Sequence, residues 1–155
     1  MDRDGVINID HSYVYKIEEF EFVEGIFKFL KEAQKRGYLL IVVTNQSGIG
    51  RGYYSLEDFE KITDFMVKKM QEEGVDIKKE QIFFCPHSPE SNCSCRKPEP
   101  KMILDAKDEF DIDLSKSILI GDKVSDIEAG IRAGVGKNIL IDKDSPISME
   151  AIDGF

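Results

Sequence analysis

The chain has 155 residues, of which 41% are hydrophobic and 33% are charged, and its formal net charge is −9. This length suits one domain with a buried core, and the acidic excess argues against a nucleic-acid partner, which favours clustered Lys and Arg. No stretch approaches the ~20 consecutive apolar residues of a membrane span, and no signal peptide precedes the first motif. We therefore expect a cytoplasmic monomer that binds neither nucleic acid nor a membrane.

The first half of the chain contains two expected helices and a strand. Apolar residues at helical spacing predict a helix over residues 24–36 that ends at Gly37 and buries Ile26, Phe27, Leu30 and Ala33. The apolar run YLLIVV over residues 38–43 predicts a strand buried on both faces. Ser55 and Asp58 approximate a capping box at the start of a second helix. That helix ends at Gly74, and its expected inner face is Leu56, Phe59, Ile62, Met66 and Met70.

The second half continues the alternation of helices and strands. Short strands are expected over residues 81–84, 117–121 and 138–141, and helices over residues 100–110 and 124–133. This alternation predicts an α/β fold with a doubly wound, Rossmann-like parallel sheet. In such sheets ligands bind at the carboxyl ends of the strands, so the polar residues that follow each strand are the candidates for a site.

Polar motifs occupy these positions, and the chain itself opens with Asp2 and Asp4. The others are Thr44 to Gly48, Arg96 with Lys97, and Asp122 with Asp126. Taken singly, they are a polar turn, a pair of solvated cations and an N-capped helix start. Taken together, they would meet at one edge of one sheet. Carboxylates gathered in this way need a cation, and hard oxygen ligands suit Mg²⁺, which would relieve the repulsion among the aspartates.

A second metal site is expected in the loop after residue 84. Cys85, His87, Cys93 and Cys95 form the pattern C-x-H-x5-C-x-C, which is a full tetrahedral ligand set for Zn²⁺. The plainer interpretation is reduced cysteines with a histidine nearby by chance. An odd number of cysteines within eleven residues argues against disulfides. Four protein ligands leave no position for water, so we expect a structural zinc that fixes the loop leading to Arg96 and Lys97.

The ordered motifs DRDGV, Thr44, Lys97 and GD…D resemble those of the haloacid dehalogenase (HAD) superfamily of phosphotransferases over nearly the whole chain. The resemblance implies that Asp2 is the nucleophile and forms an aspartyl-phosphate. Asp4 would protonate the leaving alkoxide and then activate water. Thr44 would hydrogen-bond the transferring phosphoryl group, and Lys97 would neutralise its charge.

The same resemblance implies the ligands of Mg²⁺. The carboxylates of Asp2 and Asp122 and the backbone carbonyl of Asp4 would bind the ion, whereas Asp126 would orient Lys97 or a metal-bound water.

The TNQSGIGRG segment and the CPH…CSCRKP loop narrow the resemblance to the D-glycero-D-manno-heptose 1,7-bisphosphate 7-phosphatases. That family removes the 7-phosphate in nucleotide-heptose and lipopolysaccharide core precursor synthesis, and usually lacks a large cap domain. The histidinol-phosphate phosphatases of histidine biosynthesis share the zinc loop and are the alternative. The implied sugar-phosphate contacts are Asp10, His11, Ser12, Tyr13, Thr44, Asn45, Gln46, Ser47, Arg96, Lys97 and Lys123.

Two departures from the resemblance concern the ends of the chain. Family members run an apolar strand into the first aspartate, whereas only Met1 precedes Asp2 here. We therefore expect residues 1–155 to form a single HAD-like phosphatase domain without its first strand and with a shortened carboxyl end. The nucleophile would then be unanchored. A third and less favoured class is a non-catalytic, zinc-stabilised binding domain. Such a domain would be expected to lose one of Asp2, Asp4, Lys97 and Asp122, and all four are present.

Overall fold

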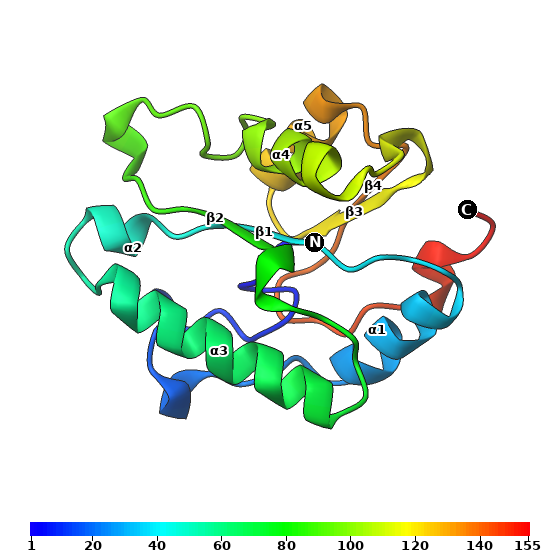
Figure 1. Cartoon of the computed structure of the whole chain (residues 1–155), viewed down its shortest axis with the longest axis horizontal. Coiled ribbons are helices and arrows are strands. Elements are labelled where there is room, and N and C mark those ends of the chain that lie inside the picture. The colour runs from blue at the N-terminus through cyan, green and yellow to red at the C-terminus, as the bar shows by residue number, and fades with distance from the viewer.

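The computed structural model describes residues 1–155 and shows the α/β alternation expected from the sequence (Figure 1). Its helices and strands are α1 (Ile26–Lys35), β1 (Val42–Asn45), α2 (Ser47–Gly50), α3 (Leu56–Glu72), β2 (Ile82–Cys85), α4 (Lys101–Phe110), β3 (Ile118–Gly121), α5 (Val124–Ala133) and β4 (Lys137–Leu140). No large cap domain interrupts this order, as expected. No helix is long and apolar enough to cross a membrane.

The strands form two parallel pairs that the first residues of the chain join. β1 pairs with β2 and β3 pairs with β4. Val43 N donates to the carbonyl of Met1 at 2.9 Å, and Asp2 N donates to the carbonyl of Ile120 at 3.0 Å. Met1 and Asp2 therefore lie between β1 and β3 and bond to both. These two backbone bonds tie the segment that carries Asp2 to both strand pairs. Whether a preceding strand would anchor the nucleophile further stays a prediction.

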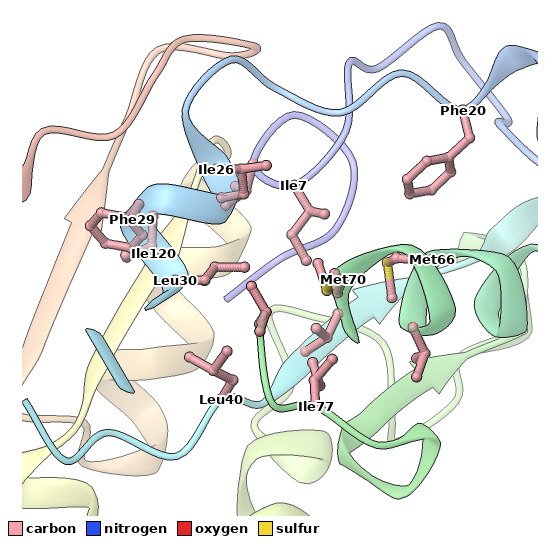
Figure 2. Packing of buried hydrophobic residues seen from close by; sticks show 14 of the residues in the cluster. Ile7, Phe20, Ile26, Phe29, Leu30, Leu40, Met66, Met70, Ile77 and Ile120 are labelled. Carbon is pink, nitrogen blue, oxygen red and sulfur yellow. The ribbon is translucent and has the colours of Figure 1, made fainter. Parts of the chain in front are cut away.

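Helices cover both faces of these strands. In Figure 1, α1 and α3 lie on one face and α4 and α5 on the other. Successive strand side chains point to opposite faces, so Val42 belongs to the larger core under α1 and α3, and Val43 to the smaller core under α4 and α5. Figure 2 shows the larger core, where Met66 and Met70 of α3 pack near Ile7.

Two local expectations need correction. The strand expected over residues 38–43 lies at Val42–Asn45, because Thr44 and Asn45 continue the parallel register opposite Phe84 and Cys85. Leu56 was expected on the inner face of α3 but is 47% exposed, because the first turn of that helix extends past the core. The expected capping box between Ser55 and Asp58 is present.

An apolar cavity of about 330 Å³ lies between β1 and β3 beside Met1. Its walls include Leu30 of α1, Ile41 next to β1 and Ile118 of β3. β1 and β3 do not pair with each other, so the space between them is closed by backbone only where Met1 and Asp2 lie.

Candidate active site

Asp2 lies at the carboxyl ends of the strands with its side chain buried. Its Oδ1 accepts hydrogen bonds from Lys97 Nζ at 3.0 Å and from Arg3 N at 2.8 Å. Burial raises the pKa of the Asp2 carboxyl, and the charges of Asp126 and Asp4 raise it further, whereas Lys97 opposes the shift. The expected nucleophile thus sits in an environment where a second cation would stabilise its charge.

Lys97 is the only cation within this buried cluster. Its Nζ contacts Asp126 Oδ1 at 2.6 Å as well as Asp2, and donates to the carbonyl of Val43 at 2.7 Å. Burial opposes protonation of Lys97, but Asp2 and Asp126 prevail and raise its pKa. Asp126 also caps α5, since its Oδ2 accepts from Lys123 N at 3.1 Å. Asp126 therefore contacts Lys97 directly, and its expected role in orienting Lys97 stays a prediction.

The carboxylate of Asp122 lacks any protein partner. Both of its oxygens are buried without a hydrogen bond, and they lie with Asp2 and Asp126 in a group whose oxygens are within 4.8 Å of one another. Burial, followed by the charges of Asp2 and Asp126, raises the pKa of Asp122 to about 7. Three carboxylates thus face one lysine, so ionising all three would leave two negative charges uncompensated. A divalent cation with oxygen ligands fits this donor set.

Gly5 leaves the space that the carboxylate of Asp122 occupies. Its φ of +87° belongs to the left-handed region, and a Cβ at this position would meet Asp122 Oδ2. Only glycine satisfies both requirements without strain.

Three side chains hold Asp4 by hydrogen bonds. The sequence predicted Gln46 as a substrate contact and gave no role to Arg3 or Asn8. Its Oδ1 accepts from Arg3 Nη2 at 2.8 Å and from Asn8 Nδ2 at 3.0 Å, and its Oδ2 accepts from Gln46 Nε2 at 3.1 Å. Burial opposes ionisation, but Arg3, with hydrogen bonds from Asn8 and Gln46, lowers the pKa of Asp4. The sequence alone does not indicate these roles of Arg3 and Asn8, apart from their place in the DRDGVIN segment.

The expected residues at the carboxyl end of β1 and directly after it support the site through hydrogen bonds. Gln46 Nε2 also donates to Thr44 Oγ1 at 2.9 Å, and its Oε1 accepts from Tyr54 at 2.5 Å. Asn45 Oδ1 accepts from Lys97 N at 3.0 Å and its Nδ2 donates to the carbonyl of Lys97 at 3.3 Å. In this geometry the amides of Asn45 and Gln46 position Lys97, Thr44 and Asp4, and Ser47 begins α2.

A polar pocket of about 30 Å³ collects part of the expected substrate set. Its lining contains no hydrophobic residue and comprises Asp2, Asp4, Asn45, Lys97, Lys123, Ser125 and Asp126. Ser125 is an addition to the expected set. Arg96 does not line this pocket; it is half-buried, and its Nη1 is buried without a partner.

The segment Asp10 to Tyr13 also lies outside this pocket. Its side chains make local contacts, such as the bond from Ser12 N to Asp10 Oδ1 at 3.0 Å and the pair of His11 with Glu21 at 3.1 Å. The ring of Tyr13 packs edge-on against that of Tyr53.

The four expected zinc ligands converge. His87 Nδ1 lies 3.5 Å from the sulfur of Cys85 and 3.3 Å from that of Cys95, and the Cys93 sulfur lies 3.5 Å and 3.8 Å from the same two atoms. A tetrahedral site with Zn–S bonds of about 2.3 Å has ligand–ligand edges of about 3.8 Å, so these separations fit Zn²⁺. The sulfurs of Cys85 and Cys95 lie within disulfide-bonding distance of each other, which the sequence did not predict.

The comparison with known proteins identifies the family. The HAD-hydrolase-like family model matches residues 94–144, which include Lys97 and Asp122. The chain is 52% identical over 144 residues to the D-glycero-alpha-D-manno-heptose-1,7-bisphosphate 7-phosphatase of Campylobacter jejuni, and the match covers 93% of this chain and 81% of that protein. The chain belongs to the heptose bisphosphate phosphatase family of the HAD superfamily.

Other members agree with this family assignment. The chain is 51% identical over 142 residues to the D-glycero-beta-D-manno-heptose-1,7-bisphosphate 7-phosphatase of Helicobacter pylori, covering 91% of this chain and 81% of that protein. A crystal structure of the D,D-heptose 1,7-bisphosphate phosphatase from B. bronchiseptica, complexed with magnesium and phosphate, matches with a TM-score of 0.81 at 32% identity. That match covers 88% of this chain and 75% of the other. The HAD assignment and the heptose phosphatase resemblance are confirmed.

Proposed function

We propose that this phosphatase removes the 7-phosphate of D-glycero-D-manno-heptose 1,7-bisphosphate with Mg²⁺ as cofactor. The observation that carries this proposal is the buried group of Asp2, Asp122 and Asp126 against a single lysine. The related proteins of Campylobacter jejuni and Helicobacter pylori are named for this reaction, although for different anomers. The product would feed nucleotide-heptose and lipopolysaccharide core precursor synthesis, as the family resemblance implies.

In the first half-reaction, a carboxylate oxygen of Asp2 attacks phosphorus and the bond from phosphorus to the sugar oxygen breaks. The leaving alkoxide takes a proton from Asp4, which enters this step as the acid. Arg3 lowers the pKa of Asp4 in the free protein, and the negative charge of the bound phosphoryl group raises it again. In the second half-reaction, water attacks phosphorus and gives its proton to Asp4, and the bond from phosphorus to Asp2 breaks. Phosphate leaves, and Asp2 and Asp4 return to their starting states.

Other side chains stabilise the transferring phosphoryl group. Lys97 Nζ is fixed by Asp2, Asp126 and the Val43 carbonyl, so its charge is in place before the substrate arrives. Thr44 Oγ1 accepts its bond from Gln46 and keeps its own O–H for the phosphoryl group. When bound, Mg²⁺ would supply Lewis-acid stabilisation of phosphoryl charge; the carboxylates of Asp2 and Asp122 and the carbonyl of Asp4 would hold it.

The cysteine loop would hold a structural Zn²⁺. A disulfide between Cys85 and Cys95 would use two of the same sulfurs, so the two states exclude each other. Zinc accounts for the convergence of His87 and Cys93 as well, which a disulfide does not require.

The second phosphate distinguishes the two candidate substrates. Arg96 directly follows the zinc loop, and its Nη1 is buried without a hydrogen-bond partner. A phosphate drawn into this part of the site would satisfy that donor. Lys123 lines the polar pocket and adds a second cation. A heptose 1,7-bisphosphate offers a remote phosphate to these side chains, whereas histidinol phosphate offers an amine that Arg96 would repel.

The test compares phosphate release from both anomers of heptose 1,7-bisphosphate and from histidinol phosphate. We expect a kcat/KM roughly 30- to 150-fold higher for a heptose bisphosphate, since a buried charged contact contributes roughly 2–3 kcal/mol. Phosphorus NMR should show the 1-phosphate retained. Arg96→Ala should erase most of this preference, whereas Arg132→Ala, which removes a surface arginine paired with Glu99, should not. Equal or faster hydrolysis of histidinol phosphate would reassign the enzyme to the alternative family.

The non-catalytic class has little support. Its expected sign is the loss of a catalytic side chain, yet Asp2, Asp4 and Lys97 line one pocket and Asp122 lies in the same carboxylate group.

A further inference from the structure

Arg3 is the largest of the fully buried side chains, with 1% of its surface exposed. A guanidinium removed from water is costly unless a counter-charge and hydrogen bonds compensate for it. Arg3 is incompletely compensated, because its Nε and Nη1 are buried without partners. An apolar side chain of similar volume would avoid this cost, so the charge and shape of Arg3 call for a reason other than stability.

Its contacts fix the guanidinium rigidly. Nη2 donates to Asp4 Oδ1 and to the carbonyl of Val14, both at 2.8 Å. The Cζ atom lies 5.7 Å from the ring centroid of Phe20 and 6.0 Å from that of Phe59, within the range of cation–π attraction. Two rings and one backbone carbonyl therefore orient the group, and its single ionic contact is Asp4.

The hydrogen bonds on Asp4 are unequally shared between its oxygens. Oδ1 accepts from both Arg3 and Asn8, whereas Oδ2 accepts only from Gln46. Each carboxylate oxygen has two acceptor sites, so Oδ1 is saturated and Oδ2 retains one. Asp4 lines the polar pocket, so Oδ2 is the oxygen left to exchange a proton there.

We propose that Arg3 is a positioning residue that holds Oδ1 of Asp4 and thereby presents Oδ2 to the leaving group and then to water. This inference rests on the proposed function, since it assigns Arg3 to the proton transfers of that reaction. Oδ2 gives its proton to the sugar alkoxide as the bond from phosphorus to the sugar breaks. It takes a proton from the attacking water as the bond from phosphorus to Asp2 breaks.

Two substrates separate positioning from a structural role. An alkyl phosphate such as the heptose bisphosphate needs a proton on its leaving oxygen, whereas p-nitrophenyl phosphate releases a stable phenolate without one. Arg3→Lys keeps the charge but loses the planar fork. We expect this variant to lose about 10- to 100-fold in kcat on the alkyl phosphate, which is part of the roughly 10²- to 10⁴-fold that general acid catalysis contributes.

With p-nitrophenyl phosphate, phosphoryl transfer in Arg3→Lys should stay within about twofold of the wild type, because this step uses no acid. Hydrolysis of the intermediate should slow, since water activation still needs Asp4. The variant should therefore show a burst of about one phenolate per site followed by slow turnover. Chromatography or mass spectrometry of the denatured protein would show the accumulated aspartyl-phosphate.

A double-mutant comparison adds a second criterion. If Arg3 acts through Asp4, Arg3→Lys introduced into Asp4→Asn should change the residual rate by less than about twofold. Arg36→Lys, at an exposed arginine paired with Glu32 and Asp153, is the matched control and should behave as the wild type. Melting curves by circular dichroism verify that each variant is folded.

Equal losses on both substrates without a burst, no loss at all, or an additive loss in the Asp4→Asn background would each overturn the role of Arg3. A wild type inactive on every phosphate monoester would instead overturn the proposed function, and this inference with it. Should Arg3→Lys not fold, Phe20→Leu removes one ring beside the guanidinium and keeps the ion pair. It should lose about threefold in kcat on the alkyl phosphate and leave the rate of the phenolate burst from p-nitrophenyl phosphate unchanged. An unchanged kcat, or an equal loss in the burst rate, would overturn the inference.

Discussion

The chemistry at the residue scale follows from how each aspartate is paired. Asp4 has an arginine of its own, Asp2 and Asp126 share Lys97, and Asp122 has no protein partner. Four carboxylates of the same type therefore take different roles because their surroundings differ. In the proposed reaction the unpaired Asp122 would bind the cation, and Asp2, one of the two carboxylates that share Lys97, would attack.

The first prediction concerns Asp2. Asp2→Asn keeps the size of the side chain but removes the attacking charge, so kcat should fall roughly 10⁴-fold or more, as for other enzymes that lose a nucleophile. No phosphorylated enzyme should accumulate on rapid quenching, and beryllofluoride should no longer form an aspartyl adduct. Asp64→Asn, at an exposed aspartate paired with Lys79, is the control and should remain fully active. Appreciable activity in Asp2→Asn would rule out the covalent route.

The sequence predicted the charged residues of the candidate site but not the residues that hold them in position. Asp2, Asp4, Lys97 and Asp122 could be named because each follows a recognisable strand or opens the chain. Arg3 could not, because an arginine between two aspartates is usually a solvated surface residue. Only the packing of Phe20 and Phe59 around it shows that it is buried.

At the scale of elements, the strand ends and the cysteine loop act together. Gln46 N donates to the carbonyl of Cys85, and Gly50 N donates to that of Pro86, each at 2.8 Å, so the loop is tied to the segment that carries Thr44 and Gln46. The same loop ends in Lys97, which Asn45 holds through its backbone. A metal in the loop would therefore restrain both sides of the phosphoryl site.

The second prediction concerns this metal. Elemental analysis should find about one Zn²⁺ per chain, as a closed four-ligand site requires. Cys93→Ser should lose most of the zinc, destabilise the fold by several kcal/mol and raise KM more than it lowers kcat, because Arg96 and Lys97 lose their support. Ser94→Ala, an exposed neighbour within the loop, is the control. A zinc-free wild type as stable as the loaded one would favour the plainer interpretation of the cysteines.

The order of helices and strands could be predicted because hydrophobic periodicity and capping residues are local signals. The capping box at Ser55 and the helix over residues 124–133 were both placed correctly. The shift of β1 to Val42–Asn45 could not be predicted, because register depends on pairing with β2, some 40 residues later in the chain. Likewise, the hydrogen bonds that join Met1 and Asp2 to β1 and β3 are tertiary contacts. They could not be predicted, because no apolar run at this point of the sequence indicates a strand.

At the scale of the whole molecule, two layers of helices enclose the two strand pairs. Backbone hydrogen bonds join β1 to β3 only through Met1 and Asp2, at the level of the site. Beside Met1 the apolar cavity of about 330 Å³ separates β1 from β3. The amino group of Met1 donates to the carbonyl of Ile41 at 2.9 Å, and burial, followed by the charge of Lys97, lowers its pKa to about 6. An amine, whether protonated or neutral, is a poorly matched neighbour for an apolar cavity.

The third prediction follows from this mismatch. A strand-forming apolar segment such as Ile-Val-Phe-Leu, added directly before Met1, would turn the amine into an amide and fill the cavity. Burying three or four such side chains contributes about 1.5–3 kcal/mol each, which ordering the added residues offsets by about 1–2 kcal/mol each. A net gain of a few kcal/mol should raise Tm by roughly 5–10 °C for a chain of this size.

Activity should rise with stability, because the backbone of Asp2 depends on the same two strands that line the cavity. The control is a segment of equal length and polar sequence, Ser-Asp-Gly-Ser, which removes the same terminal charge but cannot be buried. Differential scanning calorimetry and phosphate release on both proteins separate the two effects. If the polar and apolar segments change Tm and kcat equally, the terminal charge alone is responsible. If neither changes them, the cavity does not limit the stability of the fold, and the two bonds from Met1 and Asp2 suffice to hold the nucleophile.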